Sequence, residues 1–419
     1  MIIDFERMLK YYEELVAKGV YDYDVQRGLR GIYQNIFIKD GETFASDEEL
    51  ICKWICKQKY SYVELDAIKG CLIGGAIGDA LGLPVEFYED YEILKKYGEN
   101  GISELQLYNG IAHISDDTQM TLFTADGLLN ATKRFKNPTA DDYVQCVYEA
   151  YLDWLHTQDS TFALDKNKPH SELLKIKGLH HKRAPGTTCL TALYSGKCGT
   201  FTQKLNDSKG CGGIMRVAPV ALYLAQMPQM KIEDVAMVGA RVAAITHSHE
   251  LGYIPAAFLT AFIYYILKGE MMSRACRLAK SVTKTLFPDS KECEYCLSLV
   301  DKAIRLAFPD AEEGEEAMDN LEAIRMLGQG WVAEETLAIA VYCAFKYHED
   351  IDDFKKALVA AANHSGDSDS TAAVTGNILG AYWGLRGIPK EMVDVIEFKD
   401  LMLDLAEKMH INKLSTEIK

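Results

Sequence analysis

Apolar residues recur along most of the chain at intervals of three and four positions, whereas strict two-residue alternation between turn signals is scarce. The first spacing places apolar side chains on one face of a helix, and the second would do so for a strand. The pattern therefore predicts an all-α protein. Helices are expected, with ends uncertain by a few residues, over 118–129, 140–156, 215–226, 232–245, 252–268, 271–286, 298–307, 331–346 and 371–385.

A glycine-striped segment, AIKGCLIGGAIGDALGLPVEF, is the strongest feature of the first hundred residues. Gly70, Gly74, Gly78 and Gly82 are four apart, so they share one face of a helix that Pro84 should end. Each glycine inside a helix costs about 1 kcal/mol relative to alanine. The stripe therefore predicts the close approach of another backbone or of a ligand, and tight helix packing alone would also explain it.

Two elements are predicted in the first sixty residues. Residues 4–18 are predicted to form an amphipathic helix closed by Gly19, and 32–44 a short hairpin or extended piece. Tyrosine and arginine, which are favoured at protein interfaces, are frequent here. An extra helix packed on the domain and an arm that binds a partner both fit this composition.

Composition and charge argue against several classes of protein. The chain has 419 residues, of which 48% are hydrophobic, so it can bury a large core. Its formal charge of −16 argues against nucleic acid as a partner, because such binding needs clustered Lys and Arg. Asp79 interrupts the longest apolar run, and none reaches the about 18 uninterrupted residues of a membrane helix. The start does not resemble a secretion signal, so we expect a cytoplasmic protein with no membrane segment.

Two clusters of serine and aspartate each precede a predicted helix. Singly, each is a good N-cap, because such side chains accept backbone N–H bonds and complement the helix dipole. A cap needs only one such side chain, however, and neighbouring carboxylates repel each other unless a cation lies between them. Oxygen-rich sets of this kind suit a hard divalent cation. The clusters are Ser115, Asp116 and Asp117, and Asp367, Ser368, Asp369 and Ser370.

If the fold brings both clusters together, bound cations would polarise a ligand oxygen and position an attacking water, as glycosidic or phosphoryl hydrolysis requires. Two other interpretations of the second cluster exist. An EF-hand loop would need Gly and Glu where the chain has Ala372 and Ile378, which excludes it. A haloacid-dehalogenase-like phosphatase would place Asp367 at the end of a buried strand, whereas AANHSG precedes it. This phosphatase is kept as an alternative function.

Several segments resemble, in the same order, those of the ADP-ribosylglycohydrolase family, from about residue 66 to the last helices. They are GCLIGGAIGDALGLPVEF, SDDTQM, RAPGTTC, KGCGGIMRVAP, ITHSHELGY, GQGWVAEETLAIAVYCA and GDSDST. The resemblance implies the orthogonal multi-helix bundle of that family for a catalytic domain over 63–419, with 1–62 as an N-terminal extension. It also implies a hydrolase that removes ADP-ribose from modified protein side chains, with arginine favoured.

The resemblance also assigns roles to matched residues. Two Mg²⁺ ions are expected, with Mn²⁺ as a substitute, held by Ser115, Asp116, Asp117, Asp367, Asp369 and Ser370. Glu86 matches the active-site glutamate and is expected to transfer a proton as acid or base, with Asp117 and Asp369 also assigned to catalysis. The residues assigned to substrate binding are Asp79, Gly210, Gly212, Gly213 and His247, and the backbone amides near the three glycines are expected to cradle the pyrophosphate of the substrate. For His247 alone, a buried core histidine is the competing interpretation.

Some bacterial members of this family protect against ADP-ribosylating toxins, which suggests a hypothesis for the extension. Residues 1–40, which contain Arg27 and Arg30, would bind an ADP-ribosyltransferase toxin and block it. The expected partners are then the ADP-ribosylated protein substrate and this toxin. A non-enzymatic toxin-binding inhibitor is the second alternative for the whole chain.

Overall fold

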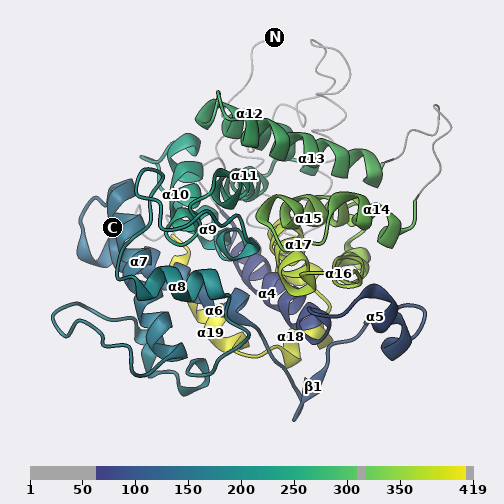
Figure 1. Ribbon diagram of the computed structural model, residues 1–419, viewed down its shortest axis with the longest axis horizontal. Coiled ribbons are helices and arrows are strands. Elements are labelled where there is room, and N and C mark those ends of the chain that lie inside the picture. Colours follow the sequence, from purple (N-terminus) through teal and green to yellow (C-terminus); the bar gives the residue numbers. More distant parts are fainter. Residues whose placement is uncertain (1–62, 309–317, 412–419) are drawn as a thin grey trace, which may run out of the picture.

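The computed structural model describes residues 63–308 and 318–411, and nearly all regular structure there is helical, which confirms the all-α class. Figure 1 shows α4 (Leu65–Gly82) near the centre, with the other helices around it. The others are α5 Asp90–Tyr97, α6 Asp116–Arg134, α7 Ala140–Gln158, α8 Thr187–Tyr194, α9 Ala218–Leu224, α10 Ile232–Ala244, α11 Glu250–Leu267, α12 Met272–Leu286, α13 Lys291–Ala307, α14 Asn320–Leu327, α15 Ala333–Tyr347, α16 Phe354–Ala362, α17 Ser368–Trp383, α18 Lys390–Val395 and α19 Lys399–Met409.

Every helix that the apolar spacing predicts within the described residues is present, with shifted ends. The largest shift is in α13, which begins at Lys291 because Ser290 caps it: the Cys293 backbone N–H donates to the Ser290 hydroxyl over 3.0 Å. Shorter helices such as α5, α8, α14 and α16 are not predicted, since each has too few turns to show a period. A hairpin of β1 (Leu107–Tyr108) and β2 (Ile111–Ala112) is also unpredicted. The elements expected within 1–62 lie outside the described residues.

The glycine stripe of α4 packs against the backbone of α17. A Cβ added to Gly74 would lie 2.5 Å from the carbonyl oxygen of Gly376, and one added to Gly376 would lie 2.0 Å from that of Gly74. At Gly78, an added Cβ would lie 2.0 Å from the carbonyl oxygen of Ala372. No side chain fits at these positions, so the stripe is explained by close packing of two backbones.

This packing also determines what meets at one end of the two helices. An added Cβ on Gly82, at the end of α4, would lie 2.2 Å from the carbonyl oxygen of Ser368, at the start of α17. The 3-10 turn Leu83–Val85 follows, with Pro84 at its start as expected, and leads into Glu86. The helix pair thus brings Glu86 to the second aspartate cluster.

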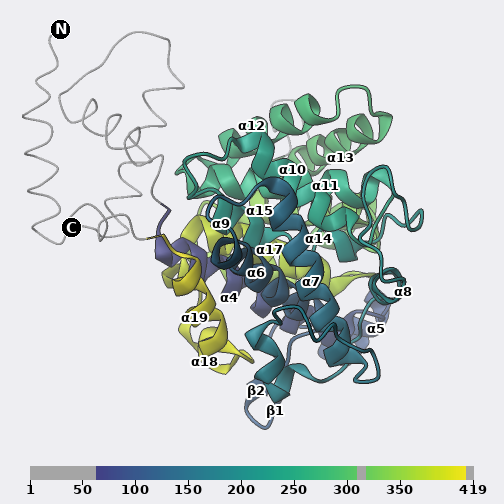
Figure 2. The ribbon, with the colours of Figure 1, turned by 90° about the vertical axis from the view of Figure 1, so that its left-hand side faces the viewer.

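Other elements surround this central pair. Figure 2 shows α19 beside α4, and α19 contacts both α4 and α6.

By length and composition, two of the described helices would be able to span a membrane: α4 with its following turn, and α11. In each, 83% of the most apolar window is buried inside the fold. Core helices of folded proteins have the same composition, so these windows reflect the centre of the bundle.

Replacing Gly78 by alanine tests the backbone contact. In an exposed helix this change would stabilise the protein by about 1 kcal/mol. Here we expect it to lower the free energy of unfolding by about 2–3 kcal/mol, because the α17 backbone cannot move aside. Gly75→Ala is the matched comparison: its Cβ would meet the side-chain amide of Asn377, which can rotate, so a smaller loss is expected. Thermal unfolding of both variants measures the difference, and a Gly78→Ala variant as stable as the parent would contradict the packing.

Candidate functional site

The first aspartate cluster begins α6, and only one of its members is used as a cap. Ser115 is the N-cap, and its hydroxyl accepts the Asp117 backbone N–H over 3.1 Å. Asp116 accepts the backbone N–H of Gly186 over 3.2 Å at one carboxylate oxygen. Asp117 extends toward α17 instead, where its Oδ2 accepts the hydroxyl of Ser370 over 2.8 Å. The predicted capping role is therefore confirmed, and it leaves carboxylate oxygens free for another purpose.

The second cluster begins α17 in the same way. Asp367 is the N-cap, with Oδ1 accepting the Ser370 backbone N–H over 3.2 Å, and Asp369 accepts the same N–H over 2.8 Å. The Asp367 backbone N–H donates to the carbonyl oxygen of Gln329 over 2.8 Å, which ties this turn to the segment before α15. Both clusters thus lie at helix N-termini, where the dipole favours negative charge.

The fold brings the two clusters and Glu86 together. The Asp117–Ser370 hydrogen bond joins residues 253 positions apart. Glu86, Asp367 and Asp369 each present a carboxylate oxygen within 4.8 Å of the other two, and all three are buried. This trio includes a residue from the end of the glycine-striped segment, a proximity that the spacing along the chain does not reveal. Such a set of oxygens is what a hard divalent cation prefers.

Burial and mutual repulsion dominate the electrostatics of these carboxyl groups. Burial and the charges of Asp369 and Asp367 raise the pKa of Glu86 to about 10. Burial, and then the charge of Asp369, also raise the pKa of Asp116 and Asp117 well above the usual range. Within the described residues, no basic side chain pairs with these groups, and Glu86 Oε2 is buried without a hydrogen-bond partner. The residues present fit a bound cation, which would replace protons as the neutralising charge.

Asp79 holds the first cluster in place. Its Oδ1 accepts the Ser115 backbone N–H over 2.9 Å, and its Oδ2 accepts the Thr118 backbone N–H over 3.1 Å and the Thr118 hydroxyl over 2.5 Å. Burial and the charge of Asp369 raise the pKa of Asp79 to about 7, although these bonds oppose the rise. In the structure Asp79 therefore positions the start of α6. Its assignment to substrate binding stays a prediction.

The glycine loop predicted to bind pyrophosphate lies over His247. A Cβ added to Gly212 would lie 2.9 Å from the His247 ring, and one added to Gly213 would lie 2.6 Å from the carbonyl oxygen of Gly252. His247 is buried, its Nδ1 lies 2.8 Å from the Thr246 hydroxyl, and burial lowers its pKa to about 3. The His247 ring is therefore uncharged and packs against the glycine loop, as a buried core histidine would. Substrate contacts of His247 and of Gly210, Gly212 and Gly213 stay predictions.

Two residues near the clusters have no role in the sequence-based interpretation. Glu397, between α18 and α19, accepts the guanidinium of Arg183 over 2.8 Å and the Ile114 backbone N–H over 3.2 Å, so it anchors the segment before α6. No local signal points to it, because its partners are more than 200 residues away. Burial and the charges of Asp367 and Asp117 raise the pKa of Cys211 well above the usual range, which places this thiol beside both clusters. The sequence signal that could have pointed to Cys211 is its position inside the matched segment KGCGGIM.

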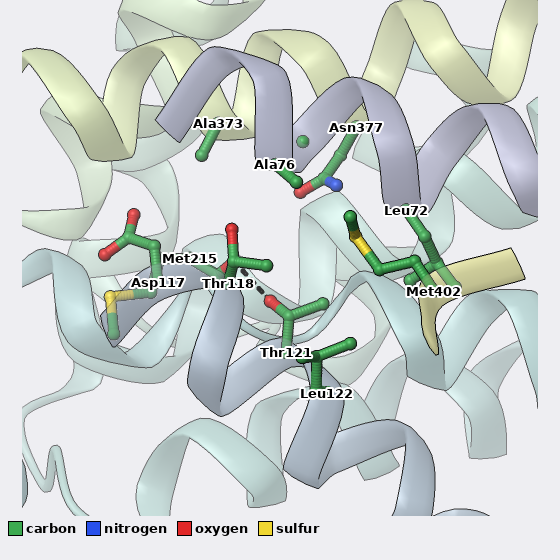
Figure 3. A pocket seen from close by; sticks show the side chains of 11 residues that line it. Leu72, Ala76, Asp117, Thr118, Thr121, Leu122, Met215, Ala373, Asn377 and Met402 are labelled. Carbon is green, nitrogen blue, oxygen red and sulfur yellow. Dashed lines mark hydrogen bonds between the residues drawn. The ribbon is translucent and has the colours of Figure 1, made fainter. Parts of the chain in front are cut away.

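A small cavity lies beneath the first cluster. Figure 3 shows Asp117 at one edge of it and Met402 at the other, with Thr118, Thr121 and Asn377 among the lining side chains. Its volume is about 10 Å³, which is about the space of one water molecule. It is therefore a packing void at the junction of α4, α6 and α17, and it is too small for a substrate.

Comparison with known proteins agrees with this geometry. The profile of the ADP-ribosylglycohydrolase family matches residues 61–417. The chain is 26% identical to ADP-ribosyl-[dinitrogen reductase] glycohydrolase of Rhodospirillum rubrum, over 80% of this chain and 91% of that protein. It is 24% identical to ADP-ribosylarginine hydrolase Tri1 of Serratia proteamaculans (82% and 79%) and 22% identical to ADP-ribosylhydrolase ARH3 of Mus musculus (83% and 91%). The chain belongs to the ADP-ribosylglycohydrolase family and is a glycosidic-bond hydrolase.

Proposed function

We propose that this hydrolase removes ADP-ribose from arginine side chains of proteins, with two Mg²⁺ ions, or Mn²⁺ in their place, bound between the two aspartate clusters. The observation that carries the proposal is the meeting of Glu86, Asp367 and Asp369 beside the Asp117–Ser370 hydrogen bond. Arginine is favoured because one relative is named as an ADP-ribosylarginine hydrolase. The strongly negative chain would also attract a cationic side chain.

The phosphatase alternative lacks its structural requirement. Asp367 follows the end of α16 and caps α17, and none of residues 363–366, which directly precede it, lies in a strand. The second alternative, a non-enzymatic toxin inhibitor, depends on residues 1–40, which lie outside the described residues. The hypothesis of a toxin partner stays a prediction.

The proposed reaction requires the residues of the site to orient the sugar, activate water and move a proton. A bound divalent cation supplies Lewis-acid stabilisation of substrate oxygens and of water. Asp117 and Asp369 would hold the cation and so help to orient the ribose and the attacking water, and burial of the cluster excludes bulk water. Glu86 Oε2, which has no partner of its own among the described residues, holds or accepts the proton that an oxocarbenium-like transition state requires.

Asp369→Asn tests the cation site, because Asp369 is the charge that most raises the pKa of Asp116, Asp117 and Asp367 after burial. We expect hydrolysis of ADP-ribosylarginine to fall by at least about 100-fold. The thermal stability of the metal-free protein should rise, because a repulsive charge is removed. Asp126→Asn, which alters another buried carboxylate on α6, is the control and should retain activity. Near-normal turnover of Asp369→Asn would contradict the assignment.

Glu86→Gln separates proton transfer from binding. The amide keeps the shape of the side chain but cannot exchange a proton, so kcat should fall by about 100- to 10,000-fold. The affinity for ADP-ribose, measured by calorimetry with Mg²⁺ present, should change little. A variant with normal kcat would exclude Glu86 as the acid or base.

The raised pKa values also predict how metal affects stability. Because the folded carboxyl groups bind protons more tightly than the unfolded ones, the metal-free protein should lose stability as pH rises from about 4 through 7, the pKa of Asp79, toward 10, the pKa of Glu86. Bound Mg²⁺ replaces these protons. The increase in melting temperature on adding Mg²⁺ should therefore be larger at pH 8 than at pH 5.5. Equal increases at both pH values would contradict this linkage.

A further inference from the structure

Two exposed aromatic side chains stack on each other beside the carboxylates. Phe87 and Trp331 have ring centroids 5.5 Å apart and an interplanar angle of 24°. Phe87 is 71% exposed and Trp331 37%, so the pair keeps a large apolar surface open to solvent. Exposed aromatic faces of this kind are able to bind a planar or cationic group.

Both rings are attached to backbone that borders the buried carboxylates. Phe87 directly follows Glu86. Trp331 directly follows Gly330, where an added Cβ would lie 3.3 Å from the carbonyl oxygen of Asp367. The aromatic pair therefore lies on the solvent side of the Glu86–Asp367–Asp369 group.

Trp331 is held in place from two directions. Its carbonyl oxygen accepts the Cys211 backbone N–H over 3.2 Å, which connects it to the glycine loop. Glu335 Oε2 accepts the backbone N–H groups of Gln329 and Gly330 over 2.9 and 3.2 Å and holds the preceding turn. Trp331 thus joins the predicted pyrophosphate loop to the carboxylate group.

The Phe87 side is anchored as well. Three residues later, the Asp90 backbone N–H donates to the hydroxyl of Ser365 over 2.8 Å, and the Asp90 carboxylate pairs with Arg325 over 2.6 Å. Both halves of the aromatic pair therefore rest on backbone that is fixed to the segments around the second cluster. A preformed surface loses little entropy when a ligand binds.

We propose that the Phe87–Trp331 pair binds the guanidinium group of the ADP-ribosylated arginine and so determines the kind of side chain that is accepted. A guanidinium is planar and cationic, and it stacks on aromatic faces that attract positive charge. A serine-linked substrate presents neither a plane nor a positive charge there. The proposal rests on the proposed arginine specificity.

The test compares two substrates with wild-type and variant enzyme in Mg²⁺: an ADP-ribosylarginine peptide and an ADP-ribosylserine peptide. Trp331→Leu removes the aromatic face and keeps an apolar side chain, whereas Trp331→Phe keeps a face. For the arginine-linked peptide, Trp331→Leu should lower kcat/KM by about tenfold, mainly through KM, and Trp331→Phe should restore most of it. Tyr295→Leu changes an exposed aromatic on α13 and should match the wild type.

The possible results of this experiment lead to different conclusions. A loss confined to the arginine-linked peptide, with unchanged affinity for free ADP-ribose, supports the proposal. A parallel loss for both peptides and for ADP-ribose would assign the rings to the nucleotide and overturn it, as would a Trp331→Leu variant that equals the wild type. If the wild-type enzyme does not cleave the arginine-linked peptide at all, the proposed arginine specificity fails first, before any variant is compared.

Discussion

The backbone contact between α4 and α17 is the constraint on which the site depends. Two helices can approach this closely only where the facing residues carry little or no side chain. The glycines of α4 meet glycine and alanine along most of the contact, and the Ser368 backbone at its end. The contact ends where the turn after α4 meets the first residues of α17. Glu86 therefore shares one small buried space with Asp367 and Asp369, although 281 positions of the chain separate Glu86 from Asp367.

The buried carboxyl groups in that space repel one another electrostatically. Several buried carboxyl groups raise one another's pKa, and the described residues provide no basic partner for them. The helix N-termini and the hydrogen bonds to Asp79 offset part of the cost. A fold optimised for stability alone would not keep this arrangement, and strongly perturbed carboxyl groups at one place are typical of functional sites.

Much of this organisation could be predicted from the sequence because it is encoded locally. The helical period, the glycine stripe and the two serine–aspartate caps each appear within a single segment. The competing explanations of the caps and of the stripe prove compatible with the functional one. Ser115 and Asp367 cap their helices, and the same geometry directs Asp117 and Asp369 toward each other's clusters.

The remaining features depend on long-range packing and have no local signal. Glu397 reaches Arg183 and Ile114 only because α19 lies beside α4 and α6. The stacking of Phe87 on Trp331 joins two segments more than 240 positions apart. His247 belongs to a matched motif, yet the ring is buried and neutral beneath the glycine loop. The matched motif thus predicts which segments meet at the site, whereas the substrate contacts of His247 stay a prediction.

The proposed cation site lies between the starts of α6 and α17. Anomalous diffraction from crystals soaked in Mn²⁺ would locate the bound ions themselves. We expect two peaks enclosed by Glu86, Asp117, Asp367 and Asp369. Peaks only at surface carboxylates, or no ordered ion at concentrations that saturate the protein, would contradict it.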